Sequence, residues 1–456
     1  MQKDSDFGAR WRVHLQLLTK SHMETVLNSN ERSVRDILKG VPRVGPTHAP
    51  RAVSDVGVRK AVLEDLALKT LYISGPFSLL ELSKQTRLSF EVANELFCRL
   101  RAEMLCQVTG MTGNIPFIAI TSQGRARAHS LLIQSQYAGP APVSLKSYVE
   151  QVQEQSVKNV DICPADVSRA FSHLVIAETT LWKFGVALNS SASIFLYGPP
   201  GVGKTTIAET LARVVAEDHV WIPYAVEVDG QIITVYDPTI HKSVNDPELR
   251  GWDERWVRCQ RPAVLVGGEL TIEMLDLQFN PVSNFYVGPV QMKANNGVLI
   301  VDDFGRQRLR PDDLLNRWVV PLDRKIDFLT LSGGMKIEIP FEMLVVFASN
   351  IDPFKLVDAA FLRRIQTKIK LGAVSEEQFC EIFRRVAHER EIEYEPTVAK
   401  DLIAFIKDVL KQELRSCYPR DIVNQICWGA KYEGRAPRLD KESAKRAVEA
   451  YFLAKD

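Results

Sequence analysis

The stretch that decides the fold reads Gly198-Pro199-Pro200-Gly201-Val202-Gly203-Lys204-Thr205-Thr206. It follows an apolar run, Ile194 to Tyr197, and leads into a helical pattern from Thr205 to Ala216. A glycine-rich turn between a strand and a helix, closed by a lysine and a hydroxyl residue, has the spacing of a P-loop. Its glycines let backbone N–H groups turn toward an anion at the helix N-terminus, where the helix dipole favours negative charge. The stretch therefore predicts a phosphate-binding loop in an α/β fold.

The residues of this loop have distinct expected roles in binding ATP. Lys204 would bridge the β- and γ-phosphates, and the Thr205 hydroxyl would be a ligand of Mg²⁺. The run from Gly198 to Thr206 is the predicted ATP-binding segment, with ATP and Mg²⁺ as the expected cofactors. A chance match is the alternative, and the strand before the loop and the helix after it weigh against that alternative.

A second apolar run ends in two carboxylates. Gly297 leads into the run Val298 to Val301, and Asp302 and Asp303 follow directly. A P-loop needs a carboxylate at the end of a neighbouring strand for the Mg²⁺ shell, and a further polar group to orient water. Asp302 is the predicted Mg²⁺ residue, and Asp303 is the predicted catalytic base that polarises the attacking water. The rival run, Ala263 to Glu269, has no Asp next to its strand end.

The P-loop, the strand before Asp302 and the sequence after it resemble the AAA+ ATPase family, over roughly Phe171 to the C-terminus. In that family the next strand ends in a polar sensor residue, and here Leu344 to Ser349 is followed by Asn350. An amide at this place can hold the γ-phosphate and the attacking water without adding charge. The resemblance thus implies a catalytic role for Asn350, and the alternative is an Asn that only begins a loop.

Two arginine motifs extend the resemblance. The segment Asp358 to Ile365 is similar to the family's arginine-finger box, in which a guanidinium reaches the γ-phosphate bound by the next subunit. Arg364 is the first choice for the finger and Arg363 is the finger or its helper, with a plain surface pair as the alternative. Arg420 resembles the second sensor, an ATP-binding arginine on the lid of the same subunit. A finger acting in trans implies a homo-oligomer, and the family implies a ring, most often a hexamer.

Three features depart from the common pattern of the family. Asp303 stands where a Glu is usual, so the base is one methylene shorter and slow hydrolysis is expected. Lys204 and Asp302 are 98 positions apart, which predicts an insertion near residues 219–296. Lys325 to Ile339 predicts a hairpin before the sensor strand, which resembles the branch of MoxR-type ATPases and magnesium-chelatase subunits. Such a hairpin either contacts a client or only widens the sheet.

Two proline-rich joints, Val41 to Pro50 and Tyr137 to Val143, set off an N-terminal part. Its first section, Trp11 to Lys39, predicts short amphipathic helices. Residues 51–136 predict three helices and a hairpin turning at Gly110 to Asn114, an order that resembles a winged-helix domain. The third helix carries glutamates beside its arginines and is a poor face for phosphates. Protein docking is therefore favoured over DNA binding, and both stay open.

The composition is that of an ordinary folded chain. Of 456 residues 46% are hydrophobic and 25% charged, and the net charge of +1 gives no overall attraction to nucleic acid or to anionic membranes. Residues 1–137 contain 18 Lys and Arg against 12 Asp and Glu, so a basic N-terminal part offsets an acidic remainder. The seven cysteines form no CxxC pair, which argues against zinc and a disulfide framework. We expect a cytoplasmic protein without membrane insertion.

The expected fold class is an α/β P-loop AAA+ core, a parallel sheet flanked by helices, with an all-helical C-terminal lid and an N-terminal winged-helix α+β domain. The expected divisions are an N-terminal segment at 1–50, the winged helix at 51–136, a linker at 137–164, the core at 165–373 and the lid at 374–456. The expected function is hydrolysis of ATP at subunit interfaces of a ring that remodels an unknown protein client. The alternatives are a DNA-associated motor or regulator anchored by the winged helix, and a nucleotide-gated scaffold with weak hydrolysis.

Overall fold

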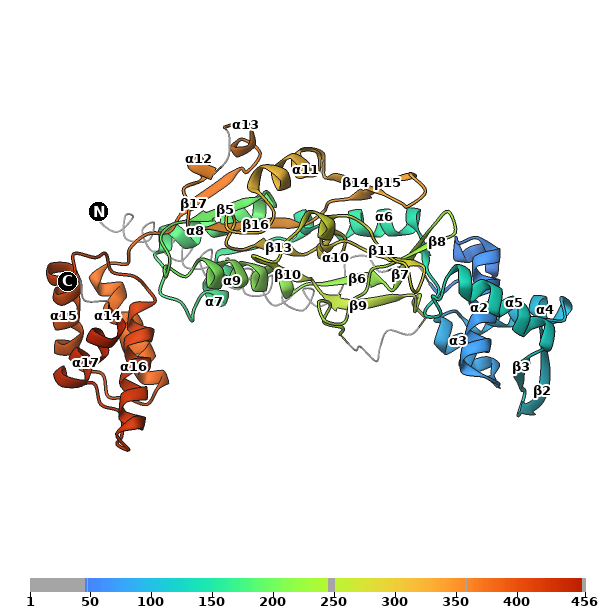
Figure 1. The fold of residues 1–456 in the computed structure, drawn as a ribbon, viewed down its shortest axis with the longest axis horizontal. Helices are drawn as coiled ribbons and strands as arrows, with labels where there is room; N and C mark the ends of the chain where they lie inside the picture. Colours follow the sequence, from blue (N-terminus) through green and yellow to red (C-terminus); the bar gives the residue numbers. More distant parts are fainter. Residues whose placement is uncertain (1–45, 47, 245–250, 357–358, 453–456) are drawn as a thin grey trace, which may run out of the picture.

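A computed structural model describes residues 46, 48–244, 251–356 and 359–452. The helices predicted between Trp11 and Lys39 lie outside these residues. The described chain forms an elongated molecule with an N-terminal unit at one end, an α/β core in the middle and a group of helices at the other end (Figure 1).

The core is built on a five-stranded sheet in which every neighbouring pair is parallel. Its strands, in spatial order, are β10 (Ala263–Val266), β13 (Val298–Val301), β16 (Leu344–Ser349), β5 (Ile194–Tyr197) and β17 (Thr367–Lys370). β5, β13 and β16 are short apolar runs, as expected for strands that are covered on both faces. The predicted parallel sheet is confirmed, whereas β17 was not predicted because its alternating Thr and Lys residues resemble an exposed segment.

Successive side chains along a strand of the core sheet point to opposite faces and pack against different helices. Ile194 and Leu196 belong to the cluster that also holds residues of α7 (Pro164–Ala170), α8 (Glu178–Ser190) and α9 (Lys204–Ala216). Phe195 faces the other cluster, which includes residues of α10 (Val290–Ala294) and α11 (Pro311–Arg324). The sheet is therefore flanked by helices on both faces, as the sequence predicts.

The segment between α9 and β13 contains additional strands, which pair with one another and with β4 from before the core. β6 (His219–Pro223) pairs with β9 (Trp256–Gln260), and a second sheet has the order β11 (Gln278–Asn280), β12 (Phe285–Val287), β8 (Gln231–Thr234), β7 (Ala225–Val228) and β4 (Val143–Ser144). Asp229 and Gly230 form the two-residue turn between β7 and β8, and both have positive φ. A two-residue turn needs positive φ at these positions to match the right-handed twist of the two strands.

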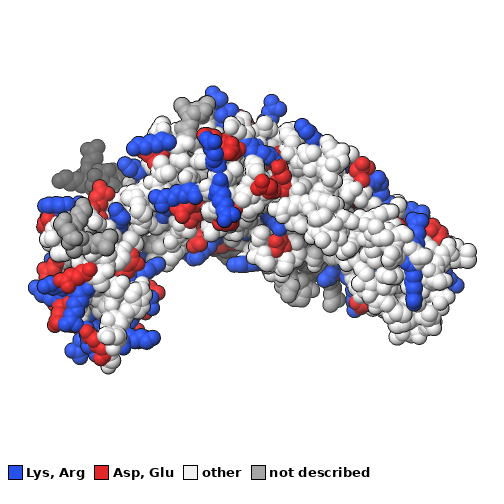
Figure 2. All heavy atoms as spheres, in the orientation of Figure 1, with Lys and Arg blue, Asp and Glu red and all other residues white. Residues whose placement is uncertain are grey.

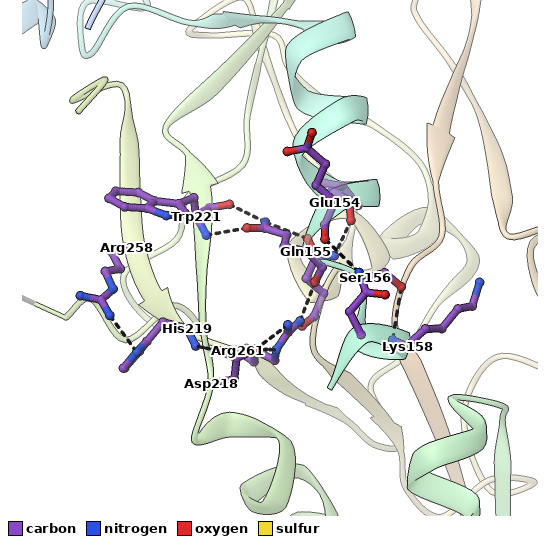
Figure 3. Close-up of polar contacts among 12 residues, drawn as sticks. Glu154, Gln155, Ser156, Lys158, Asp218, His219, Trp221, Arg258 and Arg261 are labelled. Carbon is purple, nitrogen blue, oxygen red and sulfur yellow. Dashed lines mark hydrogen bonds and ion pairs between the residues drawn. The ribbon is translucent and has the colours of Figure 1, made fainter. Parts of the chain in front are cut away.

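A buried polar network joins these strands to α6 (Leu145–Glu154) and to the start of β13 (Figure 3). The side chain of Gln155 exchanges two hydrogen bonds with the backbone of Trp221, at 2.8 and 2.9 Å. Arg261 donates to the carbonyl oxygens of Gln155 and Asn296, both at 2.7 Å, and pairs with Asp218 at 2.7 Å. These bonds join three segments, namely the end of α6, strand β6 and the residues just before β13. Because the partners are backbone groups or paired side chains, the network holds the three segments in one arrangement.

The N-terminal unit is the group of helices and strands from α2 to α5. Its elements are α2 (Lys60–Ser74), β1 (Phe77–Ser78), α3 (Leu79–Thr86), α4 (Phe90–Ala102), β2 (Cys106–Thr112), β3 (Ile115–Ile120) and α5 (Ser122–Gln134), with a sheet of order β1-β3-β2. Arg255 anchors the unit to the rest of the chain. Its buried guanidinium pairs with Asp253 at 2.7 Å and donates to the carbonyl oxygens of Val56 and Pro142, at 2.9 and 3.1 Å.

The remaining predicted hairpin and helices are also present. β14 (Ile326–Thr330) and β15 (Lys336–Pro340) form the hairpin before β16, and α14 (Glu376–Glu389), α15 (Pro396–Ala404), α16 (Tyr418–Tyr432) and α17 (Lys441–Tyr451) form the C-terminal helical unit. The helical pattern of the sequence predicts a helix from Thr397 to Gln412, and this prediction is wrong at its end. The helix widens into a π-helical turn, Phe405–Val409, and the chain leaves at Lys411, whose φ is 52°.

Charged side chains are distributed unevenly over the surface. They are dense on the core and the C-terminal helical unit and sparse on the visible face of the N-terminal unit, at the right of Figure 2. The hairpin of β2 and β3 contains no Lys, Arg, Asp or Glu. Among the helices of the described residues, none combines the length and the hydropathy needed to cross a membrane.

Candidate nucleotide-binding site

Three polar segments meet at the carboxyl end of the parallel sheet. The P-loop follows β5, Asp302 follows β13, and Asn350 follows β16, and these strands are neighbours in the order β13-β16-β5. Parallel strands end at one edge, so residues that are far apart in the sequence are brought together there. The arrangement explains why the predicted residues share one site.

The P-loop has the backbone shape that its glycines permit. Gly201 and Gly203 have φ angles of 80° and 85°, which L side chains rarely adopt. At Gly198 an added Cβ would lie 2.0 Å from the carbonyl oxygen of Leu371, so any side chain there would displace the segment after β17. Val202 points into the core and is 7% exposed. The loop thus forms a cradle lined by backbone atoms, and only glycine fits at these positions.

Lys204 lies folded back over the loop. Its ammonium donates to the carbonyl oxygens of Gly198 and Pro199, at 3.0 and 2.9 Å, and to Asn350 Oδ1 at 2.6 Å. Burial lowers the pKa of Lys204, while the carboxylates of Asp302 and Asp303 act in the opposite direction. A buried cation held by neutral oxygens next to two carboxylates is a suitable partner for an anionic phosphate.

The hydroxyl of Thr205, at the start of α9, donates to Asp302 Oδ2 at 2.7 Å. The other oxygen, Asp302 Oδ1, accepts from the backbone N–H of Asp303 at 2.9 Å, which fixes the carboxylate. A hydroxyl and a carboxylate are hard oxygen ligands of the kind that Mg²⁺ takes together with phosphate oxygens. Within the described residues there is no cluster of three or more His, Cys, Asp and Glu side chains that could hold a metal ion.

Asp303 is exposed and has a φ of 48°, in the left-handed region that is uncommon for residues other than glycine. Its Oδ1 accepts a hydrogen bond from Asn350 Nδ2 at 3.2 Å. Strained backbone at such a place is typical of sites where a side chain is held for function. The structure therefore brings Lys204, Asn350 and Asp303 into one hydrogen-bonded row.

The two candidate finger residues lie away from this row. Arg364 pairs through Nε with Asp323 Oδ2 of α11, at 2.8 Å, and its side chain is 17% exposed. Arg363 is exposed, and no residue of the described chain forms a hydrogen bond or ion pair with it. In this conformation Arg364 is paired within the same chain and Arg363 faces solvent.

The C-terminal helical unit contacts the P-loop at a place that the sequence did not reveal. The backbone N–H of Cys417 and the hydroxyl of Ser416 both donate to the carbonyl oxygen of Gly201, at 3.1 and 3.2 Å. Arg420, predicted to face the nucleotide, is exposed in the first turn of α16. No periodicity or motif marked Ser416 and Cys417, because their proximity to Gly201 depends on the tertiary packing of α16.

Comparisons with known proteins found one family model and several solved structures of similar fold. A family model described as a domain of unknown function, DUF8689, matches residues 375–450, which form the C-terminal helical unit. No curated protein matches the sequence. Solved structures similar to this one include the RuvB Holliday junction branch migration motor of Thermotoga maritima, at 14% identity and a TM-score of 0.35, with 60% of this chain and 69% of that chain covered. Domain III of the replication initiation protein DnaA from the same organism has 15% identity and a TM-score of 0.34, with 62% and 97% covered.

Proposed function

We propose that this protein is an ATPase of the AAA+ type that binds Mg²⁺-ATP at the carboxyl end of its parallel sheet. The observation that carries the proposal is the convergence of Lys204, Thr205, Asp302, Asp303 and Asn350 within hydrogen-bonding distance of one another. Five residues from three neighbouring strands form the site, and each has the chemistry that phosphoryl transfer to water requires.

Each residue has a separate task in this proposal. The P-loop backbone from Gly198 to Thr206 binds the phosphates, and Lys204 exchanges its carbonyl contacts for phosphate oxygens. Thr205 and Asp302 hold Mg²⁺, which supplies neutralisation of charge on the phosphates. Asp303 accepts a proton from water, and Asn350 orients that carboxylate through the hydrogen bond it already makes.

The same site supports assembly into a ring of copies. A cation that stabilises the transferred phosphoryl group is expected beside such a site, and in this proposal it comes from a neighbouring copy. We assign that role to Arg364 of a neighbouring copy, with Arg363 as the second choice. Use of Arg364 in this way requires it to leave Asp323.

Two surfaces are suited to a client of the MoxR-like kind. The hairpin of β14 and β15 is joined to α11 by an ion pair of Arg317 with the fully buried Asp327, at 3.1 Å through Nη2. The same helix carries Asp323, the partner of Arg364, so a movement of Arg364 would be transmitted through α11 to the hairpin.

We interpret the N-terminal unit as a winged helix from its order of helices and strands. The hairpin of β2 and β3, its wing, is uncharged and favours a protein partner over DNA.

ATP turnover by the purified full chain tests the proposal. Release of phosphate that requires Mg²⁺ and disappears in Lys204→Ala is expected, and binding of a fluorescent ATP analogue should fail in the same variant. Wild-type protein that binds no nucleotide would overturn the proposal. Wild-type protein that binds ATP and turns none over would instead favour the nucleotide-gated scaffold.

A further inference from the structure

Four consecutive residues, Ser283 to Tyr286, contact both the N-terminal unit and the hairpin of β14 and β15. We call these residues the connecting segment. They run from the turn after β11 into the first two residues of β12. Successive side chains along a strand point to opposite sides, so neighbouring residues of the segment can reach different parts of the molecule.

The first three residues of the connecting segment contact the N-terminal unit at the end of α5 and just after it. The side-chain amide of Asn284 donates a hydrogen bond to the carbonyl oxygen of Ile133, at 2.8 Å. The backbone N–H of Gln136 donates to the carbonyl oxygen of Ser283, also at 2.8 Å. The Phe285 ring packs against the hydrophobic cluster that forms the core of the N-terminal unit. These contacts fasten the segment to the N-terminal unit through backbone, side chain and core together.

The fourth residue, Tyr286, holds the tip of the hairpin. Its hydroxyl accepts from the backbone N–H of Ser332 at 2.8 Å and forms a second hydrogen bond with the serine hydroxyl. The Tyr286 ring is 1% exposed and lies 5.0 Å from the Phe279 ring, so its position is fixed by packing. At the other end of the hairpin, Asp327 is paired with Arg317 of α11. The hairpin is therefore held by α11 at its base and by β12 at its tip.

We infer that the connecting segment couples the N-terminal unit to the nucleotide site through this hairpin, so that nucleotide binding changes the packing at the end of α5. The inference rests on the proposed function, in which α11 links Arg364 to the hairpin, and it adds a means of regulating the same site. A movement of the hairpin displaces Tyr286 unless its two bonds to Ser332 break. Because coupling between two sites is reciprocal, a partner bound to the N-terminal unit changes the affinity for nucleotide by the same factor.

Hydrogen exchange on the full chain, with and without Mg²⁺ and the non-hydrolysable ATP analogue AMP-PNP, tests the inference. In the wild type, the analogue should change the exchange rates of amides in residues 128–137 by about 5-fold or more, the lower end of the usual coupling between two sites. Tyr286→Phe keeps the ring and removes only the hydroxyl, so this change should disappear while AMP-PNP still binds. Tyr137→Phe is the matched control and should behave like the wild type, because its hydroxyl bonds to the nearby carbonyl oxygen of Pro140.

The possible results separate this inference from the proposed function. If the wild type binds AMP-PNP without a change in residues 128–137, or if Tyr286→Phe still shows the change, the inference is wrong. Asn284→Gly removes the bond to Ile133, suits the φ of 53° at this position, and should reduce the change from the other end of the segment. If Tyr286→Phe fails to fold, Ser332→Ala takes its place with the same outcomes. Absence of AMP-PNP binding in the wild type would contradict the proposed function itself.

Discussion

Lys204 Nζ donates to Asn350 Oδ1 at 2.6 Å, and the amide nitrogen of the same Asn350 donates to Asp303 Oδ1 at 3.2 Å. One side chain thus holds the phosphate-binding lysine and the proposed base at a fixed separation. The two contacts use different ends of the amide, so Asn350 can do this only in one orientation. Under the proposed function, Asn350 is the residue that connects nucleotide binding to hydrolysis.

Replacing Asn350 by Ala should separate these two activities. The P-loop and Lys204 remain, so affinity for Mg²⁺-ATP should change little, whereas turnover should fall by about 100-fold because the base loses its positioning donor. Steady-state phosphate release and nucleotide binding, measured side by side, check this. Loss of binding equal to the loss of turnover would mean that Asn350 only supports Lys204.

Replacing Asp303 by Asn should reduce turnover by about 100- to 10,000-fold with binding retained, since the amide cannot accept the proton of the attacking water. Asp303→Glu restores the carboxylate one methylene further out and should keep measurable turnover. Single-turnover hydrolysis on both variants gives the comparison. Unchanged turnover in Asp303→Asn would assign the base to another group.

The ion pair of Arg364 with Asp323 predicts different behaviour for two neighbouring arginines. Arg364→Ala should lower turnover by about 1,000-fold or more in the assembled protein if it is the finger, and mixing it with Lys204→Ala subunits should restore activity at mixed interfaces. Arg363→Ala is the matched control. A larger loss in Arg363→Ala, with rescue on mixing, would move the finger to that residue.

Arg255 is expected to be decisive for stability. Arg255→Met leaves the carboxylate of Asp253 buried without its partner, so the free energy of unfolding should fall by about 3–5 kcal/mol. Lys146→Met removes an exposed lysine that pairs with the exposed Glu150, and it should cost about 1 kcal/mol or less. Urea unfolding of both variants measures the difference, and equal losses would contradict the anchoring role of Arg255.

His241 should make stability depend on pH. Its Nδ1 accepts from the backbone N–H of Asp237 and its Nε2 lies 2.8 Å from Lys293 O, so the neutral ring fits the site. Burial lowers the pKa of His241 below the ordinary 6.5, despite an opposing effect from Lys293 O and the Asp237 carboxylate, while the Lys293 charge acts in the same direction as burial. The unfolded chain then binds the proton more readily, so this stabilisation is complete above the unfolded pKa and is lost as pH falls below it.

The His241→Gln variant checks this pH dependence. The difference in unfolding free energy between wild type and variant should shrink between about pH 7.5 and about pH 5, because only the wild type loses stability by protonation of the ring. A difference that does not change over this range would show that His241 is not the titrating group.

The parts of the site that lie within one motif could be predicted. Lys204 and Thr205 follow from spacing alone, Asp302 from its position after an apolar run, and Asn350 from the resemblance to the AAA+ family. The strand β17 was missed because its Thr and Lys residues alternate on a partly exposed edge of the sheet. The end of α15 was misplaced because Ile406 and Leu410 continue the apolar spacing of four residues past its end, into the π-helical turn.

The sequence by itself determined which residues form the phosphate cradle, because the glycines, Lys204 and the adjacent strand and helix are local features that follow from backbone sterics. Only the tertiary structure decided which groups meet it. Asn350 contacts Lys204 across 146 positions, and Cys417 contacts Gly201 across an even longer separation. Contacts of this kind depend on the order of strands in the sheet and on how α16 packs, and side-chain spacing along the chain carries no record of either.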